Sequence, residues 1–175
     1  MLYKNISRRE FAKAFSLGVG SLLLFNQCKF SYKPQYRFFS AEEATLTDAI
    51  VEQIIPTDEW PGAKDAGITN FIDKQLVGSF SRFKEEYRSG LKSIMATCQN
   101  IHGKKFEELT WDEQTEFLKE LENEADRSFF GLIRNHTMAG YYGSPRHGGN
   151  YKYVSYRMIG LDIPTIQGRN KHDVS

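Results

Sequence analysis

The sequence predicts an all-α fold: a small domain of about five helices with an irregular, aromatic and glycine-rich C-terminal arm, preceded by an N-terminal export signal. Three observations lead to this prediction. Apolar side chains recur at steps of three and four residues along much of the chain between residues 40 and 140. Capping boxes open two of these stretches. No alternation of apolar and polar residues, which would indicate a strand, extends over a useful length.

Residues 1–28 are typical of a twin-arginine export signal. Basic residues precede an uncharged, apolar stretch, residues 14–25, which is 12 residues long. That length suits a signal and is too short for a bilayer core, which needs roughly 20 residues. The pathway that reads such signals exports folded proteins, so we expect a periplasmic protein that meets the twin-arginine translocase. The residues that carry the signal are Arg8, Arg9, Phe11 and Lys13.

Cys28 directly follows the apolar stretch, where lipoprotein signals place the cysteine that receives lipid. The preceding Asn26 and Gln27 are larger than the residues that lipoprotein processing favours. Lipidation of Cys28, cleavage elsewhere and an uncleaved signal that acts as a tether therefore remain open. A single acyl chain gives only marginal membrane binding without a second signal.

Composition excludes some classes of protein. Without residues 1–28 the chain has 19 Lys and Arg against 21 Asp and Glu, a net charge of −2, so there is no nucleic-acid footprint. The remaining 147 residues are enough for one domain with a core. The second cysteine, Cys98, lies in an apolar helical stripe and is expected to be a buried small hydrophobe, with an intermolecular disulfide as the alternative.

The first predicted elements follow an aromatic linker, residues 29–39. Ser40 and Glu43 form a capping box that opens a helix ending before Pro56. Residues 56–62 contain two prolines and a glycine and are expected to form a loop. A second helix is expected from Asp65 through Leu76.

The strongest helical period comes next, from residue 83 to residue 101, with Gly103 in the position of a C-cap. Thr110 and Glu113 form a second capping box, which opens a helix running to Leu121. A fifth helix is expected from about Arg127 to residue 140. The helical domain with its arm is placed at residues 40–163, and residues 164–175 are expected to be a tail.

The arm, from residue 141, changes character. Residues 143–150 combine three glycines, a proline and an asparagine with the donor-rich Arg146, and tyrosines flank them. Residues 151–158 are expected to form a short strand or an extended arm. Tyrosines of this kind are enriched at interfaces, so the arm is predicted to be a partner-binding surface, with a structural clamp onto the helical domain and a mobile surface loop as the alternatives. Its residues are Tyr141, Tyr142, Pro145, Arg146, His147, Gly148, Gly149, Asn150, Tyr151 and Tyr153.

No catalytic constellation is found in the sequence. There is no Gly-x-Gly-x-x-Gly after a strand, no Cys-x-x-Cys-His and no Gly-x-Ser-x-Gly. The four histidines form no helical pair of the kind that ligates a metal, so no metal site is expected. His136, on a helix face, is interpreted as a hydrogen-bonded core or interface residue. Neighbouring acids such as Glu107 and Glu108 are interpreted as surface charge.

A series of short motifs follows in order along the chain: Arg8-Arg9, Ile54-Ile-Pro-Thr-Asp58, Pro61-Gly-Ala-Lys-Asp-Ala-Gly67, Phe71-Ile-Asp73, Tyr87-Arg-Ser-Gly-Leu91, His102-Gly-Lys-Lys-Phe106 with Leu109, Phe129-Phe130, Gly143-Ser-Pro-Arg-His-Gly-Gly-Asn150 and Ile159-Gly160. Taken together, these motifs resemble the small subunit, subunit 3, of gluconate 2-dehydrogenase complexes. The resemblance covers nearly the whole chain past the linker, in order. Where that family usually has a tyrosine this chain has His147, and it lacks a tryptophan near Tyr156.

The resemblance implies an accessory subunit that binds no cofactor itself and has no catalytic residue. A large flavoprotein subunit with FAD would oxidise a sugar or sugar acid, and in some complexes a cytochrome c subunit with haem c would take the electrons. The linker and the arm are expected to grip the large subunit. Two alternatives remain: a stand-alone exported enzyme using His136 or His147 with Arg146 and a nearby acid, and an exported sugar-binding protein built around Trp60, Trp111 and the tyrosines.

Overall fold

The computed structural model describes residues 36–123 and 127–161. The chain divides into two units, Met1–Pro34 and Gln35–Ser175, and all described residues belong to the second. The described ranges contain helices and no strand, which confirms the all-α prediction. The α-helices are α2 (Ala41–Ile54), α3 (Ile68–Leu76), α4 (Lys84–His102), α5 (Trp111–Asn123), α6 (Arg127–Tyr142) and α7 (Val154–Met158), and the 3-10 helices are η2 (Ser81–Phe83), η3 (Phe106–Glu108), η4 (Pro145–His147) and η5 (Tyr151–Tyr153).

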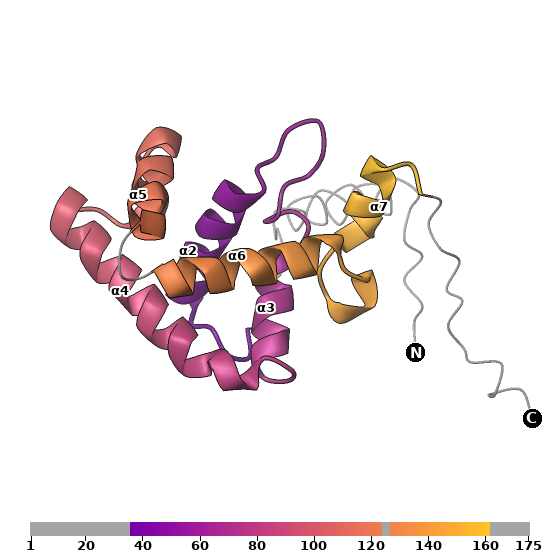
Figure 1. The fold of residues 1–175 in the computed structure, drawn as a ribbon, viewed down its shortest axis with the longest axis horizontal. Coiled ribbons are helices and arrows are strands. Elements are labelled where there is room, and N and C mark those ends of the chain that lie inside the picture. Colours follow the sequence, from indigo (N-terminus) through magenta and orange to yellow (C-terminus); the bar gives the residue numbers. More distant parts are fainter. Residues whose placement is uncertain (1–35, 124–126, 162–175) are drawn as a thin grey trace, which may run out of the picture. The chain divides into compact units, whose positions relative to one another are not determined.

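Helix α6 is the central element of the domain. It packs against α2, α3, α4 and α5, and its C-terminal end contacts α7 (Figure 1). The fully buried side chains come from most of these helices and form one core. Representative members, each at most 2% exposed, are Leu46, Ile50, Ile72, Tyr87, Leu91, Ile94 and Ile133. The core therefore lies between α6 and the helices around it.

The helix ends follow the sequence closely. Ser40 and Glu43 exchange hydrogen bonds as a capping box, with Ser40 N–H to Glu43 Oε2 at 2.7 Å and Glu43 N–H to Ser40 Oγ at 3.2 Å. Thr110 and Glu113 do the same at the start of α5. Gly103 ends α4 with φ of 65°, a left-handed conformation that glycine adopts without strain. Both predicted capping boxes and the predicted C-cap are thus confirmed.

The end of the linker is fixed to the domain by a buried carboxylate. Asp73 on α3 is 2% exposed and accepts three backbone N–H groups: Arg37 at 2.8 Å, and Phe38 and Phe39 at 2.9 Å each. Three donors compensate the burial of this charge. We call this arrangement the Asp73 clamp.

The aromatic residues of this linker end, residues 36–39, also contact the domain. Phe39 is 5% exposed and lies 5.9 Å from the ring of Tyr87. The guanidinium of Arg88 lies 4.2 Å above the ring of Phe38 and donates to the Phe38 carbonyl at 2.7 Å. The expectation that the linker grips a partner is therefore wrong for Phe38 and Phe39, because these rings are used within the chain.

The second cysteine, Cys98, was expected to be a buried small hydrophobe. It is fully buried and unpaired, so it is a small core residue as expected. Its burial is the main cause that raises the pKa of its thiol, and the nearby Glu107 and Glu108 raise it further.

In the part of the chain that the structure covers, every helix is too short or too polar to cross a lipid bilayer.

Candidate partner interface

The arm is closed on itself by the side chain of Asn150. α6 extends through Tyr142, so the irregular segment begins at Gly143. Asn150 Nδ2 donates to the carbonyl of Gly143 at 2.9 Å, and Asn150 Oδ1 accepts the N–H of Ser155 at 3.0 Å. One fully buried side chain thus bridges the two ends of a loop of about a dozen residues. We call this arrangement the Asn150 latch.

Two glycines allow the latched loop to lie directly on α6. A Cβ atom on Gly149 would stand 2.5 Å from the carbonyl oxygen of Gly140, and a Cβ on Gly140 would stand 2.5 Å from the ring of Phe71 on α3. Both distances are far below van der Waals contact. The C-terminal end of α6 is therefore held between α3 and the arm only because neither glycine has a side chain.

Two hydrogen bonds to backbone carbonyls attach the arm to α3 and to the segment just before it. Tyr151 N–H donates to the carbonyl of Ala66 at 3.0 Å, and Gln75 Nε2 donates to the carbonyl of His147 at 3.3 Å. Pro145 begins η4 and Gly148, with φ of 104°, ends it. These are the usual roles of proline at a helix start and glycine at a helix end.

Left-handed backbone replaces the strand or extended arm that the sequence analysis expected. Asn150, Lys152 and Tyr153 have φ of 48°, 55° and 60°, and residues 154–158 form α7. That expectation was wrong, because the Asn150 latch turns the chain before an extended segment can form. Such conformations cost about 1–3 kcal/mol for each residue other than glycine, so surrounding contacts must hold them.

The arm also reaches the loop of residues 56–62. Tyr141, buried at the end of α6, donates its hydroxyl to the carbonyl of Pro61 at 2.8 Å and lies 3.4 Å from Met158 Sδ on α7. The Arg157 guanidinium lies 6.0 Å from the centre of the Trp60 ring. Burial raises the pKa of the Tyr141 hydroxyl, so it serves as a neutral hydrogen-bond donor.

The outer side of the arm carries large apolar side chains. Nine large hydrophobic residues of the described ranges are exposed, and five of them fall within residues 142–161, a short part of the described chain. Ile159 is 70% exposed and Tyr151 is 60% exposed. We define the arm surface as Tyr142, Tyr151, Lys152, Arg157, Met158 and Ile159, which lie on the end of α6, on η5 and on α7 and its end. α7 contacts both α6 and η5, so these residues lie in one region.

The structure divides the ten residues predicted to bind a partner. Tyr141, Gly149 and Asn150 are buried within the chain, so they shape the arm and do not present themselves to another protein. Pro145, Gly148 and Tyr153 are half-buried. Tyr142, Arg146, His147 and Tyr151 are exposed. The glycine-rich motif is therefore first of all an internal latch.

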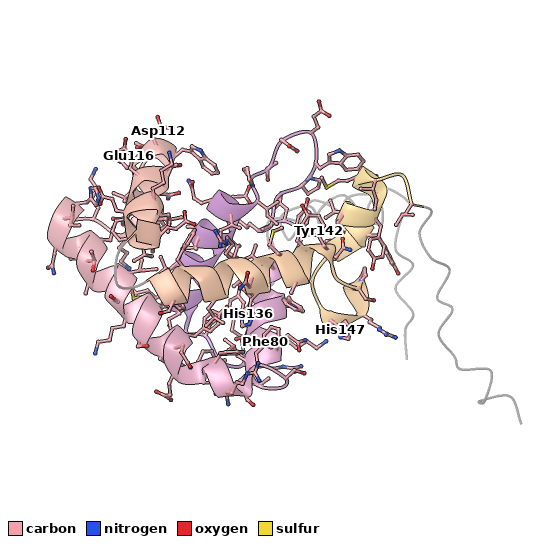
Figure 2. All side chains as sticks on the ribbon, viewed as in Figure 1. Phe80, Asp112, Glu116, His136, Tyr142 and His147 are labelled. Atoms are coloured by element: carbon pink, nitrogen blue, oxygen red, sulfur yellow. The ribbon has the colours of Figure 1, made fainter. Side chains whose placement is uncertain are left out.

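Sequence analysis missed the exposed residues on α7 and at its end: Arg157, Met158, Ile159 and Leu161. A usable signal was present in the composition. Residues 127–161 contain five Lys and Arg and no Asp or Glu, whereas residues 107–123 contain seven acids and one lysine. In Figure 2 the acidic residues Asp112 and Glu116 lie on α5, well away from Tyr142 at the other end of α6.

His136 belongs to the core, as expected. It is 7% exposed, its Nδ1 lies 3.0 Å from the Tyr87 hydroxyl, and its ring stacks on Phe80 with centroids 4.0 Å apart. Burial, and then the charge of Arg82, lowers its pKa to about 4, so the ring is neutral at pH 7. His136 lies beside Phe80, and His147 lies apart from both on the arm (Figure 2). The structure therefore leaves His136 inside the core and removes it from the stand-alone enzyme hypothesis, whereas His147 and Arg146 are exposed neighbours on η4.

The two tryptophans of the sugar-binding hypothesis lie on separate elements. Trp60 lies on the loop of residues 56–62, where its backbone N–H donates to Asp58 Oδ1 at 2.8 Å. Trp111 begins α5. A groove of about 310 Å³ between α2, α4 and η3 is lined by other side chains, with Met95 and Phe106 among them.

Within residues 36–123 and 127–161, no three His, Cys, Asp or Glu side chains are grouped to hold a metal ion. Arg8, Arg9, Phe11, Lys13 and Cys28 lie outside the described residues.

The fold and the latched arm define a class of protein: a small, all-helical domain with an irregular C-terminal segment fastened across its central helix. The chain belongs to the gluconate 2-dehydrogenase subunit 3 family, whose family model matches residues 41–162. The match begins with α2 and includes the arm, which confirms the resemblance given by the sequence motifs. No curated protein and no solved structure matches the chain.

Proposed function

We propose that this chain is the non-catalytic small subunit of a periplasmic or membrane-associated dehydrogenase complex that oxidises a sugar or sugar acid. In this proposal the catalytic subunit is a large flavoprotein that holds FAD, and a cytochrome c subunit with haem c accepts electrons where one is present. The small subunit escorts the flavoprotein through the twin-arginine pathway and stabilises it afterwards. Membership of the subunit 3 family supports this assignment.

The observation that carries the proposal is the construction of the arm. Its backbone is secured by the Asn150 latch and by the contact of Gly149 with α6, while Tyr151 and Ile159 remain outside. A free-standing monomer gains nothing from holding large apolar side chains in water, and exposed apolar patches mark interaction sites. An arm rigid in its backbone and apolar on its outer side suits a subunit that binds another protein.

The export role is tested by changing Arg8 and Arg9 together to lysine in cells that make the whole complex. We expect the flavoprotein to remain in the cytoplasm, because the signal on this chain would be the address for both proteins. The measurement is the fraction of FAD-bearing protein in the periplasm. Arg82→Lys, an exposed change of the same kind within the folded domain, is the control. Normal export of the flavoprotein by the double variant would refute the escort role.

A further inference from the structure

The arm surface combines apolar and cationic side chains without a carboxylate of its own. Lys152 Nζ lies 5.3 Å from the centre of the Tyr151 ring, and Arg157 lies over Trp60. Residues 127–161 contain no Asp or Glu. The cations of the arm are thus placed against aromatic rings.

Ion pairs elsewhere in the described residues behave differently. Three salt bridges join Arg88 to Glu43, Lys105 to Glu42 and Arg134 to Glu122. Each connects two elements of the helical body, and within the described ranges none involves the arm. Among the described residues, no salt bridge pairs Lys152 or Arg157 with a carboxylate, so both are placed to pair with one on another protein.

The backbone supports the same conclusion. Lys152 is one of three left-handed residues within positions 150–153, and Tyr151 lies between two of them. The Asn150 latch and the hydrogen bond from Tyr151 N–H to Ala66 hold this segment in place. Strained backbone that is fixed by its surroundings is concentrated at functional sites. These contacts fix the backbone of one aromatic and one cationic residue before any partner arrives, which lowers the ordering cost of binding.

We infer that the arm surface docks onto an apolar patch of the catalytic subunit that is bordered by carboxylates. Ile159 and Tyr151 supply the apolar centre, and Lys152 and Arg157 form charge pairs at its edge. The inference rests on the proposed function, since it takes the flavoprotein as the occupant. It extends that function by locating the contact on α7 and η5 and by stating the charge of the partner's surface.

The test uses the full chain with an affinity tag, isolated from cells that make the whole complex, and measures the FAD that is retained with it. The first variant is Lys152→Glu/Arg157→Glu. Its matched control is Lys92→Glu/Lys104→Glu, which makes the same change of charge at exposed positions on and after α4. We expect the arm variant to lose retained FAD by about tenfold or more and the control to retain it, because like charges across an interface repel strongly.

A second variant, Ile159→Ser, removes an exposed apolar side chain and should also weaken retention. Thermal melting of each isolated variant shows that the fold is intact, and unchanged melting is expected at these exposed positions. As a third measurement, carbodiimide coupling joins the Lys152 amine to a neighbouring carboxylate as an amide, the carbodiimide taking up the water that is released. A coupled peptide that links Lys152 to an Asp or Glu of the flavoprotein is the expected product.

The outcomes separate the inference from the proposed function. If wild type retains FAD and the two arm variants retain it equally well, the docking surface is wrong and the proposed function stands. If wild type retains no flavoprotein at all, both are overturned. If the arm variants retain FAD but lose binding to vesicles containing anionic lipid, the arm contacts a membrane surface instead, and the inference is refuted.

Discussion

The linker end, residues 36–39, and the arm, residues 143–161, are each held in shape by one polar side chain: Asp73 fastens the linker end to α3, and Asn150 closes the arm on itself. At the linker end the carboxylate of Asp73 accepts three backbone N–H groups. In the arm the amide of Asn150 both donates and accepts. The aromatic residues then differ: Phe39 is buried against Tyr87, whereas Tyr151 is exposed to solvent.

This difference teaches that aromatic content alone does not locate a partner surface. Phe38 and Phe39 looked as available for binding as the tyrosines of the arm, yet the structure uses them to attach the linker to α4. Where the backbone is held by its own polar contacts and the large side chains stay outside, as in the arm, the surface is free for another molecule.

The largest effect is expected from the Asp73 clamp. Asp73→Ala removes the acceptor of three N–H groups, two of which belong to Phe38 and Phe39, and should destabilise the domain by roughly 4 kcal/mol. Asp73→Asn keeps one acceptor oxygen and should cost about half as much. Urea unfolding of both variants measures the difference. Equal stability of Asp73→Ala and wild type would show that the linker end contributes nothing to the fold.

A smaller effect is expected on the pH dependence of stability, through the buried His136, whose ring stacks on Phe80 and Tyr87. An unfolded histidine titrates near 6.5 and His136 in the fold near 4, so between these values the unfolded chain binds a proton that the native chain does not. Stability is unaffected above pH 6.5 and falls as pH drops toward 4, by up to roughly 3 kcal/mol. Denaturant unfolding at several pH values measures the slope.

The matched variants for this slope are His136→Phe and Tyr87→Phe. His136→Phe removes the titrating group and should abolish its part of the slope. Tyr87→Phe removes the hydroxyl near Nδ1 but keeps the ring buried, and burial is the first cause of the lowered pKa. It should therefore retain most of the slope, and a flat profile for Tyr87→Phe would contradict this account.

The Asn150 latch is expected to contribute less than the clamp, because its bonds are between neutral groups. Asn150→Ala loses both hydrogen bonds and places alanine at φ of 48°, for a cost of roughly 2.5 kcal/mol. Asn150→Gly loses the same bonds but tolerates the backbone, so about 1.5 kcal/mol is expected. Thermal melting compares the two, and the order Gly more stable than Ala isolates the contribution of the left-handed backbone.

The smallest effect is expected at Ser155. Its hydroxyl is buried, and within the described residues it has no hydrogen-bond partner, although its N–H is bound by Asn150. Ser155→Ala removes an unsatisfied polar atom without touching the latch. Stability should change by less than about 0.5 kcal/mol or rise slightly. A large loss on melting would mean that the hydroxyl has a partner in the complete chain.

Much of the fold was predictable because its helix signals are local. The capping boxes at Ser40 and Thr110 and the C-cap at Gly103 each involve residues a few positions apart, so the sequence displays them directly. The Asp73 clamp was not predictable in this way. Its donors lie 34 to 36 residues earlier in the chain, and an aspartate within an apolar helix face gives no sign of which backbone it will bind.

The candidate site was predicted in outline only. The motif of residues 143–150 was singled out as a partner-binding segment, but Gly149 and Asn150 act inside the fold through contacts with Gly140, Gly143 and Ser155. Three left-handed residues in four positions cannot be derived from propensity, since lysine and tyrosine disfavour that conformation. The helix at residues 154–158 follows from the same turn and was missed for the same reason.

The Asp73 clamp also sets a boundary for engineering. A foreign leader sequence exchanged for residues 1–35 would leave Arg37, Phe38 and Phe39 to donate their three N–H groups as before. A shortened chain that starts at Ser40 would keep every helix that the structure describes but leave the buried Asp73 carboxylate without those donors. The choice of starting residue, over a distance of only four positions, therefore decides whether the isolated domain can be produced in a stable form.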